Sequence, residues 1–256
     1  MIIFDQVSVA YTLSSPVFKN WSFTIPDNSI TTILGANGSG KTTLLKCLTN
    51  QLHIYEGSIT INGERVSLLN SKELAKLIAY VPQNCISSID YRVLDFIAFG
   101  RTPHLRLLET PSEKDYRFAF DCAEECGITH ISEKSMTAIS GGERQLAYIA
   151  RALAQETSTI IMDEPMSALD FGNQSVILKI IADLANRGKT IVFTSHNPNH
   201  ALAISSNVLV IDQEKNVIWG DASHLLKQDG VLAKVFGSKI LYQNSKNGGY
   251  ITFNLL

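Results

Sequence analysis

The chain opens with alternating apolar and polar residues and later changes to short apolar runs separated by helical patterns. The alternation over Ile2–Ile25 predicts two strands, with a turn at Thr12–Pro16. From residue 159 onward, apolar runs of strand length alternate with segments of helical periodicity. The expected strands are Thr159–Met162, Thr190–Thr194 and Val208–Ile211, and the expected helices are Val176–Ala185 and Asn199–Ser205. This order is typical of parallel strands joined by helical crossovers.

The middle of the chain combines short strands with a longer helical stretch. A strand at Ile30–Leu34 leads into a Gly-rich turn and an apolar helix at Thr42–Leu48, and Ser58–Ile61 followed by Asn62-Gly63 predicts a hairpin. After a strand at Leu77–Val81 the pattern is helical as far as Leu153. Two helices are expected there, one through Val93, Phe96 and Ile97, and one through Tyr116, Phe120, Ala123 and Cys126.

These elements predict an α/β fold with a mostly parallel sheet, an N-terminal antiparallel β subdomain and a helical insert. The 256 residues are enough for one such domain with its own hydrophobic core. We expect the core at about 1–83 and 151–225, the helical subdomain at about 84–150, and a C-terminal extension at about 226–256. Of all parts of the chain, the extension has the least clear pattern of apolar and polar residues.

Composition excludes several classes of protein. With 45% apolar and 18% charged residues the chain is not expected to be disordered, and a net charge of −2 argues against a nucleic-acid partner. The sequence contains no run of 18 apolar residues, so no membrane span is expected. The N-terminus does not have the pattern of a signal peptide. The four scattered cysteines are typical of reduced thiols in a cytoplasmic protein. Cys122 and Cys126 lie four residues apart without a second pair, so packing is their expected role.

The Gly-rich turn carries the strongest chemical signal. Gly35–Thr42 fits the phosphate-loop pattern G-x-x-x-x-G-K-[ST], between a strand and a helix. Its glycines let successive N–H groups turn toward phosphates, and the helix N-terminus adds partial positive charge. Lys41 is expected to reach the β- and γ-phosphates, and the Thr42 hydroxyl to hold Mg²⁺. The residues expected to bind nucleotide here are Gly35, Asn37, Gly38, Ser39, Gly40, Lys41, Thr42 and Thr43.

A second element of such a site is expected at the end of the strand Thr159–Met162. Asp163 and Glu164 follow it directly, and α/β sheets bind ligands at the carboxyl ends of their strands. Asp163 is expected to hold Mg²⁺, and Glu164 to act as general base on the attacking water. Neighbouring side chains on a strand point in opposite directions, so the backbone must bend at this pair. Together the two motifs predict a P-loop ATPase core.

The segment Ile139–Glu143, which reads Ile-Ser-Gly-Gly-Glu, narrows this broad group. It resembles the signature motif of ATP-binding cassette (ABC) ATPases, usually Leu-Ser-Gly-Gly-Gln, at the spacing that the family shows before the acidic pair. The resemblance implies ATP and Mg²⁺ as cofactors, and a second copy of the chain as partner, because two copies of the family enclose two ATP molecules. It implies that four residues cap the γ-phosphate held by the other copy: Ser140, Gly141, Gly142 and Glu143.

Other landmarks of the family follow in order along about residues 1–225. Tyr11 resembles the aromatic residue that stacks on adenine, and Gln83 resembles the glutamine that senses Mg²⁺. Ser167–Asp170 resembles the loop that crosses to the opposite active site, with Asp170 at its end. His196 resembles the histidine that contacts the γ-phosphate, whereas His200 is expected on the surface of the next helix.

Three positions depart from the usual family residues. Ile139 and Glu143 replace Leu and Gln in the signature, and Met166 stands where the family often has Thr. Glu143 is expected to add negative charge near a phosphate. Every essential polar position is nevertheless filled, which implies an active ATPase.

Three segments resemble the ATPases of iron-siderophore, haem and cobalamin uptake, including molybdate/tungstate members. They are Phe99–His104, Ala168–Gln174 and Ser195–Leu202. The resemblance implies a separate, peripheral subunit at the cytoplasmic face of the inner (plasma) membrane. Its implied partners are integral-membrane permease subunits and, indirectly, a substrate-binding protein, and Phe99–His104 lies in the insert that receives the permease.

The sequence leaves alternatives open for the transported cargo and for the class of protein. Fe(III)-siderophore is the first expectation for the cargo, with haem, cobalamin and molybdate/tungstate behind it. A soluble cassette protein acting on nucleic acid or ribosomes, an Fe–S assembly subunit and a separate-subunit exporter are the competing classes. Membrane association separates the transporter alternatives from the first two.

Overall fold

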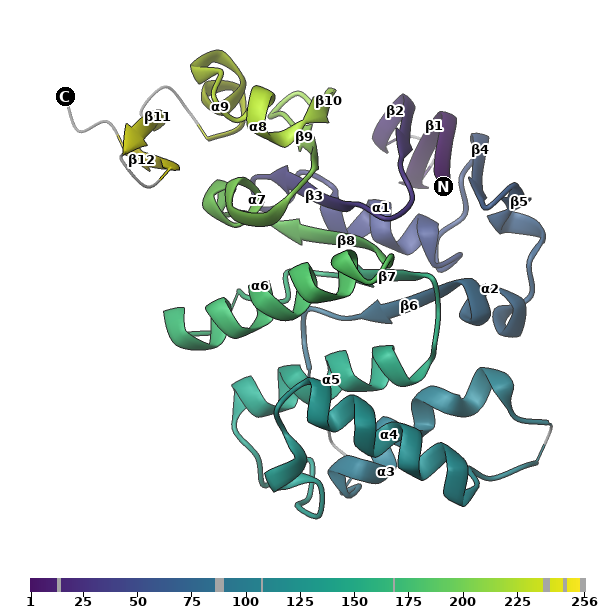
Figure 1. Ribbon diagram of the computed structural model, residues 1–256. Coiled ribbons are helices and arrows are strands. Elements are labelled where there is room, and N and C mark those ends of the chain that lie inside the picture. The colour runs from purple at the N-terminus through teal and green to yellow at the C-terminus, as the bar shows by residue number, and fades with distance from the viewer. Residues whose placement is uncertain are drawn as a thin grey trace. The chain divides into compact units, whose positions relative to one another are not determined.

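The structure is a computed structural model that describes residues 1–12, 15–85, 90–106, 108–167, 169–236, 240–245 and 248–253 (Figure 1). The chain forms two compact units, Met1–Leu69 with Leu184–Leu256, and Asn70–Asp183. The limits expected for a core, a helical subdomain and a C-terminal extension stay a prediction. Residues 13 and 14 of the predicted turn, and Ala168 of the predicted crossing loop, lie outside the described residues.

An antiparallel sheet opens the first unit. Its strands are β1 (Ile2–Thr12), β2 (Ser15–Ile25), β4 (Glu56–Ile61) and β5 (Glu64–Arg65), in the order β2-β1-β4-β5. The alternation in β1 changes phase at Gln6, whose φ of 50° marks a bulge, so that the buried apolar residues are Ile2, Phe4, Val7 and Val9. The hairpin predicted at Asn62-Gly63 is confirmed, since both residues have positive φ, as the tight turn between β4 and β5 requires.

Parallel strands form the other sheet of the first unit. β3 (Ile30–Gly35) lies between β8 (Thr190–Ser195) and β9 (Asn207–Ile211), both parallel to it, and β10 (Val217–Asp221) pairs antiparallel with β9. Every residue of β3 and β8 is buried, as expected of strands covered on both faces. α1 (Lys41–Leu48) follows β3, and α7 (Pro198–Ile204) follows β8. The carboxyl ends of β3 and β8 therefore carry the predicted phosphate loop and His196.

The end of the chain belongs to the first unit and packs against α7 and β9. Its elements are α8 (Ala222–Leu225), α9 (Asp229–Phe236), β11 (Ile240–Ser245) and β12 (Gly248–Phe253). β11 contacts α9, and β12 contacts α7. Asn199 on α7 joins the hairpin, because its carboxamide donates to the Ile251 carbonyl (3.0 Å) and accepts from the Ile251 N–H (2.8 Å). Apolar residues of α7, β9, α8, α9 and the hairpin share one buried cluster.

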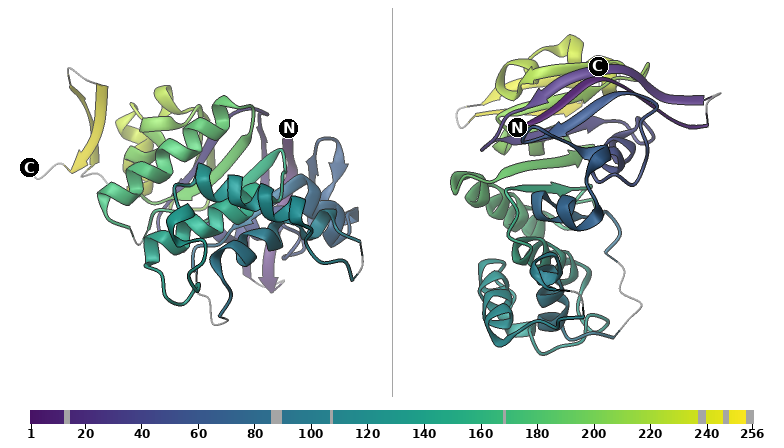
Figure 2. Two further views of the ribbon diagram at one scale, coloured as in Figure 1. Left: turned by 60° about the horizontal axis from the view of Figure 1, so that its bottom comes forward. Right: turned by 90° about the vertical axis from the view of Figure 1, so that its right-hand side faces the viewer.

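The second unit is mainly helical. It contains α2 (Ser71–Leu77), α3 (Val93–Ala98), α4 (Glu113–Glu125), α5 (Gly141–Ala154), most of α6 (Phe171–Asn186), and the short 3₁₀ turns η2 (Phe99–His104) and η3 (Thr129–Ile131). A third such turn, η1 (Val66–Leu68), belongs to the first unit. β6 (Ile78–Val81) and β7 (Thr159–Met162) pair in parallel. Figure 2 shows α3, α4 and α5 side by side, and all three contact one another.

The buried face of α4 differs from the predicted one. Phe120 was expected on the inner face with Ala123 and Cys126, but 42% of it is exposed. Ala119, Cys122 and Ala123 are buried instead, because small residues let α4 approach α3 and α5 closely. Burial raises the pKa of the Cys122 thiol to about 12, which suits a packing role. In the part of the chain that the structure describes, no cluster of His, Cys, Asp and Glu could hold a metal ion.

Candidate functional site

The predicted phosphate loop is a tight turn between β3 and α1. Gly38 and Gly40 have φ of 79° and 110°, which side chains with a Cβ rarely adopt. A Cβ on Gly35 would lie 2.4 Å from the Ser39 hydroxyl oxygen, so the backbone closes on itself there. The Ser39 hydroxyl is buried and has no hydrogen-bond partner among the residues that the structure describes. A buried unpaired hydroxyl inside such a loop is what a bound phosphate oxygen would satisfy.

Lys41 is folded back over the loop. Its ammonium donates to the carbonyls of Gly35 (2.9 Å) and Ala36 (3.2 Å), and the residue is only 5% exposed. These contacts hold a positive charge beside the N-terminus of α1, where the helix dipole also favours an anion. The residues of the loop thus fit phosphate groups by both backbone shape and charge.

Tyr11 and His196 lie close to this loop in the first unit. The Tyr11 hydroxyl is 3.3 Å from the Thr43 hydroxyl in the first turn of α1, and 59% of Tyr11 is exposed. Ser195 pairs with Leu34, so His196 and Gly35 follow neighbouring strand ends. An exposed ring and an imidazole flanking the phosphate loop fit the predicted contacts with adenine and γ-phosphate, which stay predictions.

The acidic pair of the second unit stands where β7 ends. Asp163 is 1% exposed, and its N–H donates to the Val81 carbonyl at 2.9 Å. Glu164 has a φ of 43°, a left-handed conformation that is uncommon for a residue with a side chain. The backbone therefore bends at this pair as predicted, which turns one carboxylate into the interior and leaves the other half-buried. The negative charge of Asp163 adds to burial in raising the pKa of Tyr80 to about 12.

Gln83 and Glu164 share a cleft in the second unit. The Gln83 carboxamide donates to the Glu164 carboxylate at 3.4 Å, at the long limit of a hydrogen bond. The cleft has a volume of about 170 Å³, and its lining includes Gln83, Cys85, Gly141, Gln145, Glu164 and Ser167. The structure thus brings Gln83, Glu164 and the start of the signature segment together.

Ser140 and Glu143 of the signature segment form a capping box at the start of α5. The Glu143 N–H donates to the Ser140 hydroxyl (3.2 Å), and the Ser140 N–H donates to the Glu143 carboxylate (2.7 Å). The bond from the Ser140 backbone is the first cause that holds the pKa of Glu143 below its ordinary value. This explains how Glu serves in place of Gln, because either side chain can accept from the N-cap backbone. The contact of these residues with a nucleotide stays a prediction.

Asp170 lies next to this capping box. It accepts two hydrogen bonds from Asn173, one from the backbone and one from the side chain, both 2.9 Å long. These bonds hold the pKa of Asp170 below its ordinary value. The Asn173 carboxamide approaches Gly142 so closely that a Cβ there would lie 3.1 Å from its nitrogen. Asn173, which sequence reasoning missed, lies between Asp170 and the signature segment, and its position three residues after Asp170 was the available signal.

His200 is not a surface residue, so that expectation was wrong. It is 9% exposed, and its two ring nitrogens face Ser195 and Asn197. Burial and then the charge of His196 hold the pKa of His200 below its ordinary value. Its spacing of four residues from His196 places it one turn into α7, next to the buried Ala201.

The segment Phe99–His104 holds the C-terminal end of α5. The Arg101 guanidinium donates to the Ala154 carbonyl (2.9 Å) and bonds Asp115 and Glu156, and the His104 ring lies 2.9 Å from the Gln155 carbonyl. Gly100 allows this approach, because a Cβ there would lie 2.3 Å from the Arg151 carbonyl oxygen. The side chains therefore cap the last carbonyls of the helix that begins with the signature.

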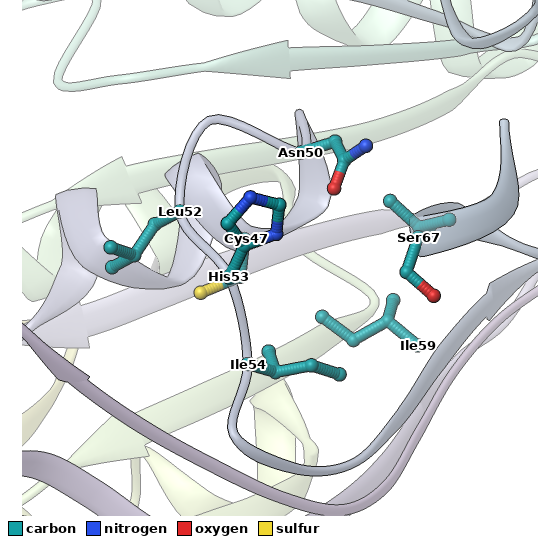
Figure 3. A pocket seen from close by; sticks show the side chains of 8 residues that line it. Cys47, Asn50, Leu52, His53, Ile54, Ile59 and Ser67 are labelled. Atoms are coloured by element: carbon teal, nitrogen blue, oxygen red, sulfur yellow. The ribbon is translucent and has the colours of Figure 1, made fainter. Parts of the chain in front are cut away.

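A small hollow at the far end of α1 contributes nothing to the predicted site (Figure 3). It has a volume of about 40 Å³. Its lining comes from the end of α1, the following loop, β4 and η1, and consists of Cys47, Asn50, Leu52, His53, Ile54, Ile59, Val66 and Ser67. Burial raises the pKa of the Cys47 thiol to about 12, which disfavours the thiolate form that reacts.

Comparison with known proteins decides the family. Residues 18–167, more than half of the chain, match the family model described as ABC transporter. The chain belongs to the ABC transporter family. As a member it is an ATPase, which binds ATP and hydrolyses it, and its P-loop α/β fold is the predicted one.

Individual ABC proteins resemble almost the whole chain. The molybdate import ATP-binding protein MolC of Haemophilus influenzae is 34% identical over 230 residues, covering 90% of this chain and 85% of that protein. The ferric enterobactin transport ATP-binding protein FepC of Escherichia coli is 31% identical over 238 residues, covering 93% and 87%. A solved structure of a metal-chelate type ABC transporter in an inward-facing conformation matches with a TM-score of 0.86 and 31% identity, covering 98% of this chain and 96% of that one.

The predicted site residues lie in both units. The first unit holds Tyr11, the phosphate loop and His196, and the second holds Gln83, the signature, the acidic pair and Asp170. Within the described residues, every helix is too short or too polar to cross a lipid bilayer.

Proposed function

We propose that the chain is the ATP-hydrolysing subunit of an ABC importer that takes up a metal chelate, an Fe(III)-siderophore complex. The observation that carries this proposal is the likeness to a metal-chelate type transporter over 98% of the chain at 31% identity. FepC, a ferric enterobactin transport protein, supports the Fe(III)-siderophore as cargo.

In the proposed chemistry the phosphate loop and Lys41 bind the phosphates of ATP, and Tyr11 stacks on its adenine. Thr42, Asp163 and Gln83 would hold Mg²⁺, since hydroxyl, carboxylate and carboxamide oxygens are the hard ligands that this ion takes. The ion would neutralise charge on the β- and γ-phosphates. Glu164 accepts a proton from the attacking water, and His196 contacts the γ-phosphate.

Two copies of the chain act together in this proposal. The signature of one copy, Ser140–Glu143, caps the γ-phosphate that the phosphate loop of the other copy holds. The Ser140 hydroxyl accepts from the Glu143 N–H, and its own proton can donate to a phosphate oxygen. ATP therefore favours the closed pair, and hydrolysis reopens it.

The closed and open pairs would drive permease subunits between inward- and outward-facing states. We propose that the chain binds these subunits at the cytoplasmic face of the inner membrane, with a substrate-binding protein delivering the chelate. Nucleic acid is not a partner in this proposal.

Purification from native membranes tests the assembly. A tagged copy should recover a polytopic permease, and vesicles containing that permease, its binding protein and internal ATP should accumulate ⁵⁵Fe-siderophore. Vesicles with the Glu164→Gln chain should not accumulate it. Recovery of soluble nucleic-acid or Fe–S assembly factors without a permease, or transport in the outward direction, would contradict the proposal.

Molybdate is the second candidate cargo, because MolC is 34% identical over 90% of the chain. Haem and cobalamin are the other cargoes that this class suggests. The same vesicles separate them: uptake of labelled molybdate with no uptake of ⁵⁵Fe-siderophore would replace the cargo and leave the importer function intact.

A further inference from the structure

His200 is a buried imidazole whose two contacts flank His196 in the sequence. Its Nδ1 lies 3.1 Å from the Ser195 hydroxyl oxygen, and its Nε2 lies 3.3 Å from the Asn197 side-chain nitrogen. His196 itself is exposed, while His200 is only 9% exposed. One ring therefore connects the residue before His196 with the residue after it.

The hydrogen bonds of Asn197 settle which way its carboxamide points. Its oxygen accepts from the Asn199 N–H at 3.0 Å, as the N-cap of α7. The amide nitrogen is therefore the atom that faces His200, and it can only donate. It follows that His200 Nε2 accepts and carries no proton.

Ser195 completes a closed set of hydrogen bonds with Asn197 and His200, which we call the hydrogen-bond circuit. With Nε2 as acceptor, a neutral His200 has its proton on Nδ1 and donates it to the Ser195 hydroxyl. The Ser195 oxygen also accepts from the Asn197 N–H (3.0 Å), and its own proton goes to the Asn197 carbonyl (3.2 Å). Every donor in the circuit has an acceptor only when His200 is neutral, since a second ring proton would face the Asn197 amide protons.

The helix that carries this ring is itself fixed. Asn199, the residue before His200, exchanges two hydrogen bonds with the backbone of Ile251 in the C-terminal hairpin. Pro198 begins α7 with a preset φ, and Ala201 packs into the buried cluster. The imidazole thus connects the His196 loop to a helix that is hydrogen-bonded to the C-terminal hairpin.

We propose that His200 is a positioning residue for His196: as a neutral, Nδ1-protonated imidazole it closes the loop Ser195–Asn197 and fixes the backbone from which His196 reaches the γ-phosphate. The inference rests on the proposed function for the role of His196, and adds to it the residue that holds that loop in place. A loosened loop would lower the rate of hydrolysis and leave ADP binding unchanged, because ADP has no γ-phosphate.

Three variants, His200→Phe, His200→Asn and His200→Gln, separate the contacts of His200, and a fourth is the control. His200→Phe keeps a ring and removes both bonds. An Asn side chain can place its amide where Nδ1 stands and keep the bond to Ser195, whereas a Gln side chain can reach the position of Nε2 and keep the bond to Asn197. His224→Ala is the matched control, because this exposed histidine on α8 is not part of the circuit.

Kinetics supply the first readout. We expect kcat for ATP hydrolysis to fall roughly tenfold or more in His200→Phe, with smaller losses in His200→Asn and His200→Gln, and no change in His224→Ala. The affinity for ADP should be the same in all four. Thermal unfolding identifies any variant that does not fold, and the Asn and Gln variants then decide the outcome.

Nuclear magnetic resonance of ¹⁵N-histidine-labelled protein supplies a readout that does not depend on activity. The spectrum should show His200 as the neutral, Nδ1-protonated tautomer, and the His196 signals should shift or broaden in His200→Phe. Unchanged His196 signals, or a His200 protonated on Nε2, would overturn the inference.

The variant His196→Ala separates this inference from the proposed function. If it loses hydrolysis while the His200 variants keep the wild-type kcat, the positioning role is wrong and the proposed function stands. If it keeps the wild-type kcat, the proposed role of His196 is wrong, and the His196 signals alone decide whether His200 holds the loop.

Discussion

Two loops of the first unit follow neighbouring parallel strands and hold their shapes by different means. The phosphate loop after β3 is shaped by its backbone, with Gly38 and Gly40 at positive φ and loop carbonyls around the Lys41 ammonium. The loop after β8 is shaped by side chains, through a circuit of Ser195, Asn197 and His200. A backbone-shaped loop leaves a motif of glycines in the sequence, whereas a side-chain circuit uses common residues whose spacing has no motif.

The largest effect is expected at the charge held by the backbone-shaped loop. Lys41→Met keeps most of the buried stem and removes the ammonium, so ATP turnover should fall by about 100-fold or more. Phosphate release at saturating ATP measures it. Lys46→Met, in the last turn of the same helix, is the control and should keep the wild-type rate. Normal turnover in Lys41→Met would mean that the loop binds phosphate by its backbone alone.

Gly40→Ala tests whether the backbone shapes the first loop. Since Gly40 has a φ of 110°, a Cβ there should lower the free energy of unfolding by about 1–3 kcal/mol and weaken ATP binding. Urea unfolding and nucleotide titration measure the two effects. Gly230→Ala is the matched control, because a Cβ at that helical glycine meets no atom of the described residues within 4 Å, and it should be neutral or stabilising. Equal stability of both variants would mean that the positive φ of Gly40 does not shape the phosphate loop.

Arg101 extends the comparison to a second site made by side chains. Arg101→Ala removes the bonds to Ala154, Asp115 and Glu156, and should lower the free energy of unfolding by about 1–3 kcal/mol, because the guanidinium is largely buried. Arg117→Ala breaks only an exposed pair with Glu113 and should change stability by less than about 0.5 kcal/mol. Thermal unfolding of the two variants measures the difference. An equal change would mean that the contacts of Arg101 do not stabilise the fold.

The smallest expected effect is a pH dependence of the free energy of unfolding that comes from the His200 imidazole. The folded chain holds the pKa of His200 below its ordinary value of 6.5, so below pH 6.5 the unfolded chain binds a proton that the folded chain does not. The free energy of unfolding should therefore fall as the pH drops from 6.5 toward that lowered value, with no change from this group above 6.5. Urea unfolding across this range should show a shallower slope for His200→Gln. An identical slope would mean that His200 is protonated in the folded chain.

Sequence reasoning predicted what the backbone determines. The strands and helices expected between Ile2 and Ile211, the Asn62-Gly63 turn, the phosphate loop and the bend at Asp163-Glu164 follow from local conformational rules and were found. Helix α2 and the elements after β9 were not predicted. The capping box of Ser140 and Glu143 was not predicted, although its partners lie three residues apart and the spacing was a signal for it.

Sequence reasoning missed what depends on contacts between distant residues. The bulge at Gln6 and the outward face of Phe120 depend on which neighbouring element each strand or helix meets. The bond between Asn199 and Ile251 joins residues 52 apart in the chain, and Arg101 reaches Glu156 across 55. His200 looked like a surface residue because its burial is decided by the loop that it holds.

Turnover of the Glu164→Gln chain tests directly whether this chain hydrolyses ATP with Glu164 as general base. A carboxamide cannot accept the proton of the attacking water, so phosphate release at saturating ATP should fall by about 100-fold or more. ATP binding should remain, and ATP should hold two copies together long enough to be seen as a dimer by size-exclusion chromatography. Glu124→Gln, an exposed position on α4, should behave as wild type. Wild-type phosphate release from Glu164→Gln would contradict the account.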